Sequence, residues 1–334
     1  MKRHGVSNVP HRPGQPEMRA RLQSISQSRT LHRHHPILAL QQQIGNRGAA
    51  RLVDENNPYL QRKLAVDPAR FTGTKSTEKF EKFKQMILNE LKAVTGLDLE
   101  FSANLLEDKS KKTVKLVSQT AAKVLKMALR PAKKIFIDPL QKTGGAPTAR
   151  GIEISTASVP MKLKAMRTGI VIIHELAHRF ASSLKPPNYD KRMKSIEQKA
   201  KNKGALTPEE AELLFFYRPV HIEADENIPV SVANEIRKEM GLIERTHYGF
   251  HIEFPKKVGK TGLDKFTTYS QFKISSSPPV YIYLEVGNWD LYSSSKDYFK
   301  ELLKKGHPPA PNASEFKKIN KGTKAYQAIK GHLE

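Results

Sequence analysis

Two histidines and a glutamate form the pattern with the clearest chemical meaning in this sequence. Residues 173–178 read Ile-His-Glu-Leu-Ala-His, so His174 and His178 are four residues apart and Glu175 follows the first of them. Side chains four residues apart lie on the same face of a helix, so both imidazoles can bind one metal ion. Glu175 projects about 100° away around the helix, where it can take a proton from water on that ion. The pattern predicts a zinc site that hydrolyses amide bonds.

The residues around this motif predict that its helix is buried. Ile170 and Val171 precede it, and Phe180 and Ala181 follow it. Buried polar side chains cost free energy unless they are paired or bound to a metal. The apolar surroundings therefore favour a metal site, and two core histidines with ordinary partners are the alternative.

A catalytic zinc site needs a third protein ligand. The metzincin extension of the motif would place glycine at position 181 and histidine at 184, but the chain has Ala181 and Leu184 there. A carboxylate is therefore expected, and the downstream candidates are Glu197, Glu209, Glu210, Glu223 and Glu226.

The last two candidates belong to a helix predicted over about 220–240. At about 100° per residue, one stripe of this helix carries polar side chains where a core face would be apolar. Its members are Glu223, Glu226, Val230, Asn234 and Arg237. An exposed charged face is the alternative, and Pro229 must kink the helix or lie in its first turn. Glu209 and Glu210 stand where a helix N-terminus collects acids.

The same segment carries Asp225-Glu226, then Asn234-x-x-Arg237, then Arg245-x-x-Tyr248. With the His-Glu-x-x-His helix, this order resembles the NleD-type effector metallopeptidases over about residues 130–250. The resemblance implies a zincin fold with one Zn²⁺ and proteolysis inside a host cell, where known members cut stress-activated MAP kinases. It implies Glu226 as the third ligand, and Arg245 and Tyr248 as donors to the tetrahedral oxyanion.

Some positions depart from the family pattern. The acidic pair begins with Asp225 rather than Glu, and Asn227 and Pro229 are unusual within the motif. Glu223 therefore stays open as the alternative ligand. Three further histidines lie close to the motif: His221, His247 and His251. We expect them at the surface or beside the site rather than on the metal, with His247 in a position to assist Tyr248.

Composition limits the chemistry and the partners. The 334 residues include no cysteine, which excludes disulfides, a cysteine-ligated zinc site and a cysteine nucleophile. Lys and Arg number 57 against 33 Asp and Glu, and the net charge of +24 favours encounters with acidic surfaces. No apolar stretch approaches the roughly 20 residues of a membrane-spanning helix.

The first 51 residues differ from the rest. They contain many basic, Pro, Ser and Gln residues, with Glu17 as their only acid, and this composition predicts disorder. Residues 36–53 resemble the short leader found in cargo proteins of extracellular contractile injection systems. That resemblance implies that residues 1–55 contact an injection tube or its loading machinery, and that the protein is made in a bacterial cytoplasm and acts in the cytosol of a target cell. An Arg- and Ser-rich start is also similar to a mitochondrial transit peptide.

Taken together, the patterns predict an α+β protein. We expect a disordered basic leader over 1–60 and a zincin-like metallopeptidase domain over 70–255, mainly helical with a small sheet. A C-terminal extension over 256–334 should end in a basic tail, and the protein should be a monomer. Helices are expected over about 76–96, 114–130, 161–184, 220–240 and 296–304, and strands at 97–101, 135–137, 151–155 and 280–286.

Two other functions remain open from the sequence. A basic protein that binds nucleic acid or an anionic membrane, with a structural zinc site, would also explain the charge. A DNA-linked protease of the SprT type would explain both His-Glu-Leu-Ala-His and the charge. The missing cysteines, and the lack of a well-placed third histidine between residues 179 and 220, argue against it.

Overall fold

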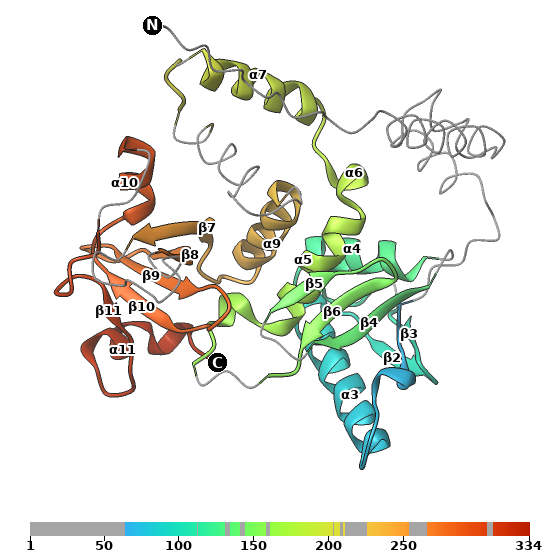
Figure 1. The fold of residues 1–334 in the computed structure, drawn as a ribbon. Helices are drawn as coiled ribbons and strands as arrows, with labels where there is room; N and C mark the ends of the chain where they lie inside the picture. Colours follow the sequence, from blue (N-terminus) through green and yellow to red (C-terminus); the bar gives the residue numbers. More distant parts are fainter. Residues whose placement is uncertain are drawn as a thin grey trace, which may run out of the picture. The chain divides into compact units, whose positions relative to one another are not determined.

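The computed structural model describes residues 64–111, 113–130, 134–140, 144–157, 161–202, 204–207, 210, 226–253, 266–305 and 310–334. These residues belong to a compact unit over Gln61–Glu334, and they form eight α-helices and two β-sheets (Figure 1). The predicted α+β class is confirmed. The expectation of a small sheet is wrong, because the sheets have six and five strands. The predicted leader over 1–60 lies outside the described residues.

The first sheet has the strand order β2-β3-β1-β4-β6-β5. Its strands are β1 (Leu64–Val66), β2 (Leu99–Ser102), β3 (Leu105–Asp108), β4 (Ile135–Leu140), β5 (Gly145–Pro147) and β6 (Gly151–Ser155). The three central strands β1, β4 and β6 run parallel, and β5 pairs antiparallel with β6 at the edge. Most of these strands have three to five residues, too few for a clear alternating pattern in the sequence.

Five helices accompany this sheet: α3 (Ser76–Thr95), α4 (Gln119–Leu129), α5 (Thr168–Arg179), α6 (Ala181–Leu184) and α9 (Asn227–Glu239). The predicted apolar face of α3 is buried, and Gly96 ends the helix in the left-handed conformation that glycine adopts most easily. The helix expected from about residue 114 begins only at Gln119. The Ser118 hydroxyl accepts a hydrogen bond from the N–H of Ala121, and this cap fixes the start of α4.

The long helix expected over 161–184 is divided. Leu163 forms a β-bridge with Leu333, and Lys164–Met166 is a short 3-10 helix before α5 begins at Thr168. The helix stops at Phe180, and α6 follows as a separate turn. Periodicity identified α5 but could not show that the residues before it pair with the far end of the chain.

The second sheet is an antiparallel meander with the order β11-β10-β9-β8-β7. Its strands are β7 (Arg245–Glu253), β8 (Phe266–Ile274), β9 (Val280–Glu285), β10 (Leu291–Ser294) and β11 (Lys317–Lys318). The strand expected at 280–286 is confirmed as β9. The boundary expected at residue 255, between the metallopeptidase domain and the C-terminal extension, lies between β7 and β8. These two strands pair along their lengths. The residues expected to form a basic tail include Ile319 and Ile329, which are buried in the core.

The remaining elements are the 3-10 helices Pro68–Arg70 and Lys330–His332, and the helices α7 (Tyr189–Lys201), α10 (Tyr298–Lys305) and α11 (Lys324–Ile329). The helix expected at 296–304 corresponds to α10. Among the described residues, every helix is too short or too polar to cross a membrane.

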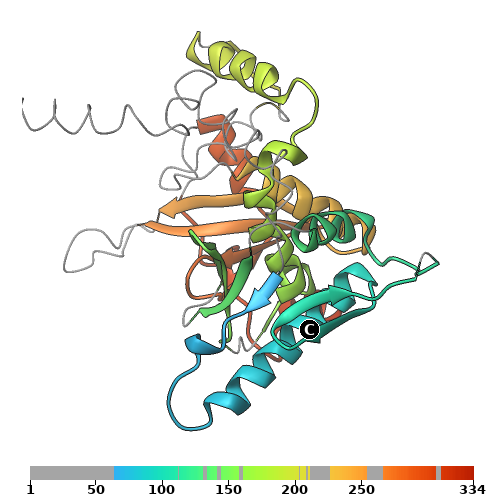
Figure 2. The same cartoon turned by 90° about the vertical axis from the view of Figure 1, so that its right-hand side faces the viewer.

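Helix α5 contributes to the cores of both sheets. Ile170, Ile172 and Ile173 pack in the core that joins the first sheet to its helices. Val171 packs against this core and also against the core of the second sheet. Figures 1 and 2 show the course of α5 beside the first sheet and the strands of the second. The helix with the zinc motif is thus held between two sheets.

The close packing of α5 on α3 can be tested at Gly169. A Cβ atom there would lie 2.5 Å from the carbonyl oxygen of Glu90 and 2.8 Å from Val94 Cγ1. We expect Gly169→Ala to lower the free energy of unfolding by about 1–3 kcal/mol, because α5 must move away from α3. Urea denaturation measures this change. The control is Gly331→Ala, where a Cβ would meet nothing within 4 Å. Equal stabilities of the two variants would contradict the packing.

Candidate metal centre

Hydrogen bonds hold both ends of helix α5, and they thereby set the positions of His174 and His178. Near its start, the carboxylate of Glu90 on α3 accepts hydrogen bonds from Arg167 Nε at 3.2 Å and from the N–H of Gly169 at 2.9 Å. At its end, Arg179 Nη1 donates to the carbonyl oxygen of Thr148 at 2.8 Å, in the turn between β5 and β6. The apolar residues of the helix are buried. The motif is therefore carried by a rigid element.

Helix α9 supplies the carboxylate. Glu226 precedes its first residue, and Pro229 lies in the first turn, where a missing N–H costs no helical hydrogen bond. Of the two expectations for Pro229, the first turn is correct. Ala233 and Ile236 bury α9 in the same core as α5. At the other end, Glu239 accepts hydrogen bonds from Thr120 and Ser118 at the start of α4.

His174, His178 and Glu226 come together in space. Glu226 Oε2 lies 3.2 Å from His174 Nε2 and 3.4 Å from His178 Nε2. One ligand atom from each residue can be chosen so that all three lie within 4.8 Å of one another. Ligand atoms about 2.0–2.1 Å from a tetrahedral zinc ion are separated by about 3.3 Å. The spacing therefore allows these three side chains to hold one metal ion.

The alignment of these groups also suits a metal. Glu226 Oε2 is buried and makes no well-aligned hydrogen bond, although two imidazole nitrogens are close to it. This is expected when three ligand atoms point at a common centre rather than at each other. Burial acts to raise the pKa of Glu226, but the two imidazoles outweigh it and lower the pKa to about 2. The carboxylate is thus ionised and ready to bind a cation.

Glu175 lies beside this group without a partner for one of its oxygens. Its side chain is 5% exposed, and Oε2 has no hydrogen bond. A Cβ atom on Gly145 of β5 would approach Glu175 Oε1 to 2.9 Å, so a glycine is needed opposite the carboxylate. Burial raises the pKa of Glu175, and the two imidazoles only partly oppose this effect. Such a carboxylate is a stronger base than one in water.

Arg245 and Tyr248 reach the site from β7. The Arg245 guanidinium lies 4.6 Å from the centre of the Tyr248 ring, and that ring is 6.2 Å from the His174 ring. Burial raises the pKa of the Tyr248 phenol, so it stays protonated and can donate a hydrogen bond. Arg245 is also buried. The structure therefore places both residues beside the metal ligands.

Asn234 explains how α9 and β7 are connected. Its amide group donates to the carbonyl oxygen of Arg245 at 2.8 Å and accepts from the N–H of Arg245 at 3.0 Å. Its oxygen also accepts from Arg237 Nη1 at 2.8 Å. The polar stripe predicted on α9 is thus neither an exposed face nor only a ligand set. Glu226 belongs to the metal site, and Asn234 holds Arg245 in place.

The other candidates have different positions. Glu210 accepts hydrogen bonds from the Thr207 N–H and from Lys199 Nζ, so it has a structural role near a helix start. Among the described residues, Glu197 is outside the group that could hold a metal. The structure does not describe Glu209, Glu223 or His221.

The other two nearby histidines have neighbours on α10 and on β8. His247 is buried and stacks on Phe299, with ring centres 4.0 Å apart. Burial, together with the nearby charge of Arg245, lowers the pKa of His247 to about 3. His251 Nδ1 pairs with Thr268 Oγ1 at 2.9 Å. The pairing of β7 is irregular between Arg245 and Phe250, so simple alternation of side chains does not apply there: Arg245 and Tyr248 both line the cavity, and His247 packs on Phe299.

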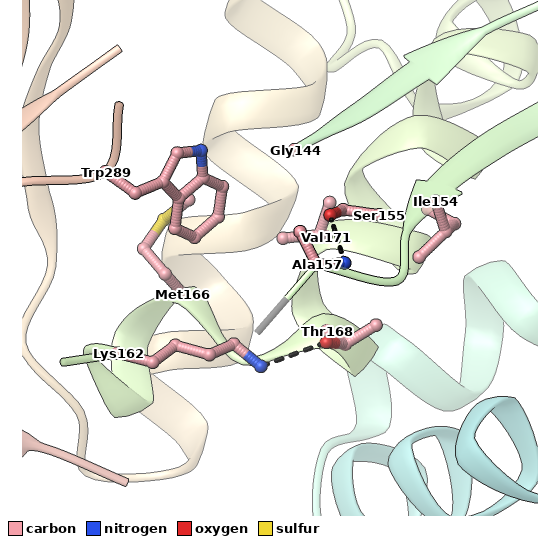
Figure 3. A pocket seen from close by; sticks show the side chains of 9 residues that line it. All are labelled: Gly144, Ile154, Ser155, Ala157, Lys162, Met166, Thr168, Val171 and Trp289. Carbon is pink, nitrogen blue, oxygen red and sulfur yellow. Dashed lines mark hydrogen bonds between the residues drawn. The ribbon is translucent and has the colours of Figure 1, made fainter. Parts of the chain in front are cut away.

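A cavity of about 210 Å³ gives access to these groups. Its wall includes the motif residues His174, Glu175, Arg237, Arg245 and Tyr248. It also includes residues that carry no sequence motif: Gly144, Gly145, Met166, Ser270, Glu285 and Trp289. Figure 3 shows a smaller recess next to it, where Trp289 and Met166 lie opposite Ser155 and Val171 and Lys162 donates to Thr168. Sequence reasoning missed these residues because they come from separate segments.

Zinc binding tests the ligand set. We expect one zinc ion per chain. Glu226→Gln should weaken zinc binding by more than about 100-fold, because even the loss of a residue that only supports a metal ligand can weaken binding by up to about 100-fold. Glu223→Gln, the alternative from the sequence, should leave the affinity unchanged. Competition with a chelating dye measures both. A larger loss for Glu223→Gln would assign the third ligand to that residue instead.

The ionised side chain of Glu175 should lower the free energy of unfolding of the metal-free protein. Its pKa is raised in the fold, so its ionised form is destabilising at pH values above that raised pKa, and the cost vanishes below the ordinary pKa of about 4.5. We expect Glu175→Gln to stabilise the chelator-treated protein at pH 8, on the order of 1 kcal/mol, and to have no effect at pH 4. Denaturant titrations at both pH values measure this. A destabilised variant at pH 8 would show that Glu175 is well solvated or paired.

Comparison with known proteins gives no family for the chain: no protein-family model, curated protein or solved structure matches it. The chemistry of the site therefore has to support the functional conclusion.

Proposed function

We propose that the chain is a zinc-dependent metalloendopeptidase with a zincin-like catalytic domain. One observation carries the proposal: His174, His178 and Glu226 converge on a common point, and the buried, unpartnered carboxylate of Glu175 lies in the wall of the adjoining cavity. A three-ligand set with a base beside it is the arrangement of a hydrolytic zinc site.

A purely structural zinc site fits less well. Structural sites are closed by four protein ligands, usually including cysteines. The chain has no cysteine, and among the described residues the group contains three possible ligands. His174 also lines an open cavity. A site that only stabilised the fold would have no need for Glu175, whose burial costs free energy.

The roles of the protein groups follow from their environments. A bound zinc ion supplies a Lewis acid and lowers the pKa of its water to about 7. Glu175, whose pKa is raised by burial, would accept a proton from the attacking water and pass it to the leaving amine. Tyr248 remains a neutral donor, and Arg245 adds positive charge next to it. Tyr248 would donate a hydrogen bond to the carbonyl oxygen as negative charge develops on it, and the positive charge of Arg245 beside the phenol would support this stabilisation.

The edge of the first sheet supports a peptide as the substrate. Strand β5 is at the end of the sheet, and within the described residues it pairs with β6 alone. Gly144 and Gly145 at its start line the cavity with His174 and Glu175. An extended peptide can add to such an edge through main-chain hydrogen bonds. The absence of side chains at Gly144 and Gly145 lets a peptide backbone come close to Glu175.

The biological setting is proposed from the sequence resemblances. We propose that the protein is a toxin or effector that is loaded through residues 1–55 into an injection device and cuts host-cell proteins, with protein kinases as candidate substrates. A basic protein suits acidic partners, and the net charge of +24 would favour encounters with them. The alternative, docking on nucleic acid or an anionic membrane, would show binding that weakens steeply with salt.

Glu175→Gln separates metal binding from catalysis. We expect this variant to keep one zinc per chain and to lose about 10²–10⁴-fold in cleavage rate, because the proton acceptor is gone while the ligands remain. Cleavage-site mapping on host-cell lysate by mass spectrometry measures the rate for each cut peptide. Glu153→Gln, a change on β6 outside the cavity, is the control. An unchanged set of cuts in the zinc-loaded Glu175 variant would contradict the proposed function.

A further inference from the structure

Two arginine side chains lie side by side in the wall of the cavity. Arg237 is 2% exposed and Arg245 is 5% exposed. Their Nη2 atoms both approach Met166 Sδ, at 3.6 Å and 2.9 Å respectively, and both guanidinium groups lie near the ring of Phe272. Arg237 is on α9 and Arg245 is on β7, so two elements bring like charges together in an apolar setting.

Within the part of the chain that the structure describes, neither arginine forms a salt bridge. Arg237 donates to neutral acceptors, the carbonyl oxygen of Ala165 and the side chain of Asn234, each at 2.8 Å. The one guanidinium hydrogen bond of Arg245 goes to Met166 Sδ, and its buried Nε has no partner. Guanidinium groups stay charged in proteins, and buried charges are normally paired.

The nearby carboxylates form no salt bridge with either arginine in the described part of the chain. The charge of Glu244 acts on Arg237, but Glu244 is exposed and lies outside the cavity wall. Glu175 and Glu226 lie toward the histidines, and a divalent cation held there would offset their charge. Glu285 also lines the cavity, but its oxygens accept hydrogen bonds from Asn288 Nδ2 at 2.8 Å and from the Tyr292 hydroxyl at 3.1 Å. In the zinc-loaded protein, both arginines would therefore keep a positive charge in the cavity wall without a salt-bridge partner among the described residues.

We propose that Arg237 and Arg245 bind a carboxylate group of the peptide substrate in the cavity beside the metal ligands. The proposal rests on the proposed function, because the metal must offset the nearby glutamates. Guanidinium groups match the planar geometry of a carboxylate and bind it through paired hydrogen bonds. The cavity of about 210 Å³ leaves room for a short acidic group.

This carboxylate has two sources in a peptide. An aspartate or glutamate side chain would make the enzyme select acidic sequences next to the cut bond. A C-terminal carboxylate would make it remove residues from chain ends. Both sources would present the same group to the arginines, and a binding experiment can separate them.

The experiment uses the zinc-loaded Glu175→Gln protein, which should bind peptides without cutting them. The probes are three pools of N-acetyl hexapeptides with random neutral residues: amides with a central Glu, the same amides with Gln, and the Gln pool with a free C-terminal carboxylate. Fluorescence of Trp289, the single tryptophan and part of the cavity wall, reports binding. We expect at least one carboxylate pool to bind about tenfold or more tightly than the neutral amides.

Adding Arg237→Met should abolish that preference, and Arg150→Met is the control. Arg150 pairs with Asp67 and Asp138 and lies outside the cavity wall, so its loss should leave the preference intact. If Arg237→Met does not fold, Arg237→Lys keeps the charge and removes the planar group, and it should reduce the preference. The pool that binds more tightly identifies the source of the carboxylate.

Two results would overturn the inference. One is equal binding of all three pools by the zinc-loaded Glu175→Gln protein. The other is a carboxylate preference that survives both Arg237 variants, since the metal alone would then bind the acid. Both results leave zinc binding and cleavage untouched. Failure to bind zinc, or cleavage without Glu175, would instead contradict the proposed function.

Discussion

The candidate site depends on one packing contact, that of the start of α9 against the helix that carries His174 and His178. The contact brings a buried carboxylate to within 3.4 Å of both imidazoles. A carboxylate in an apolar core is unfavourable unless cations or strong donors surround it. Ala233 and Ile236 hold α9 in the core, and the N–H groups and hydroxyl groups at the start of α4 hold its far end through Glu239. Apolar burial thus stabilises a polar arrangement that would not form by itself.

The second sheet completes the site through Asn234. This side chain binds both main-chain polar groups of Arg245, so the start of β7 has a fixed position relative to α9. The same strand brings Arg245 and Tyr248 toward the cavity while His247 faces the opposite core. The cavity therefore combines ligands from helices, main chain from the edge of one sheet, and donors from another. Buried polar groups in such a network keep one geometry only while every partner is present.

Glu175 shows how function and stability oppose each other here. Its carboxylate is buried opposite Gly145, and one oxygen has no partner. The fold tolerates this cost because α5 is anchored at Glu90 and near Thr148, and its apolar residues are buried on two sides. A base kept from water is stronger than one in solution. The rigidity of α5 therefore has a chemical use in addition to its role in the core.

The sequence by itself determined the local chemistry. The spacing of His174 and His178 defines one helical face, and the apolar residues around them indicate burial, because both properties depend on neighbours along the chain. The family resemblance carried by the motifs also implied Glu226, Arg245 and Tyr248, which the structure brings close to the histidines. Tertiary structure alone decided the rest. The bridge from Leu163 to Leu333, the pairing of β7 with β8, and the approach of Arg237 to Arg245 join distant segments. Short strands and long-range contacts leave no periodic signal, so the cavity and its charges emerge only when the chain is folded.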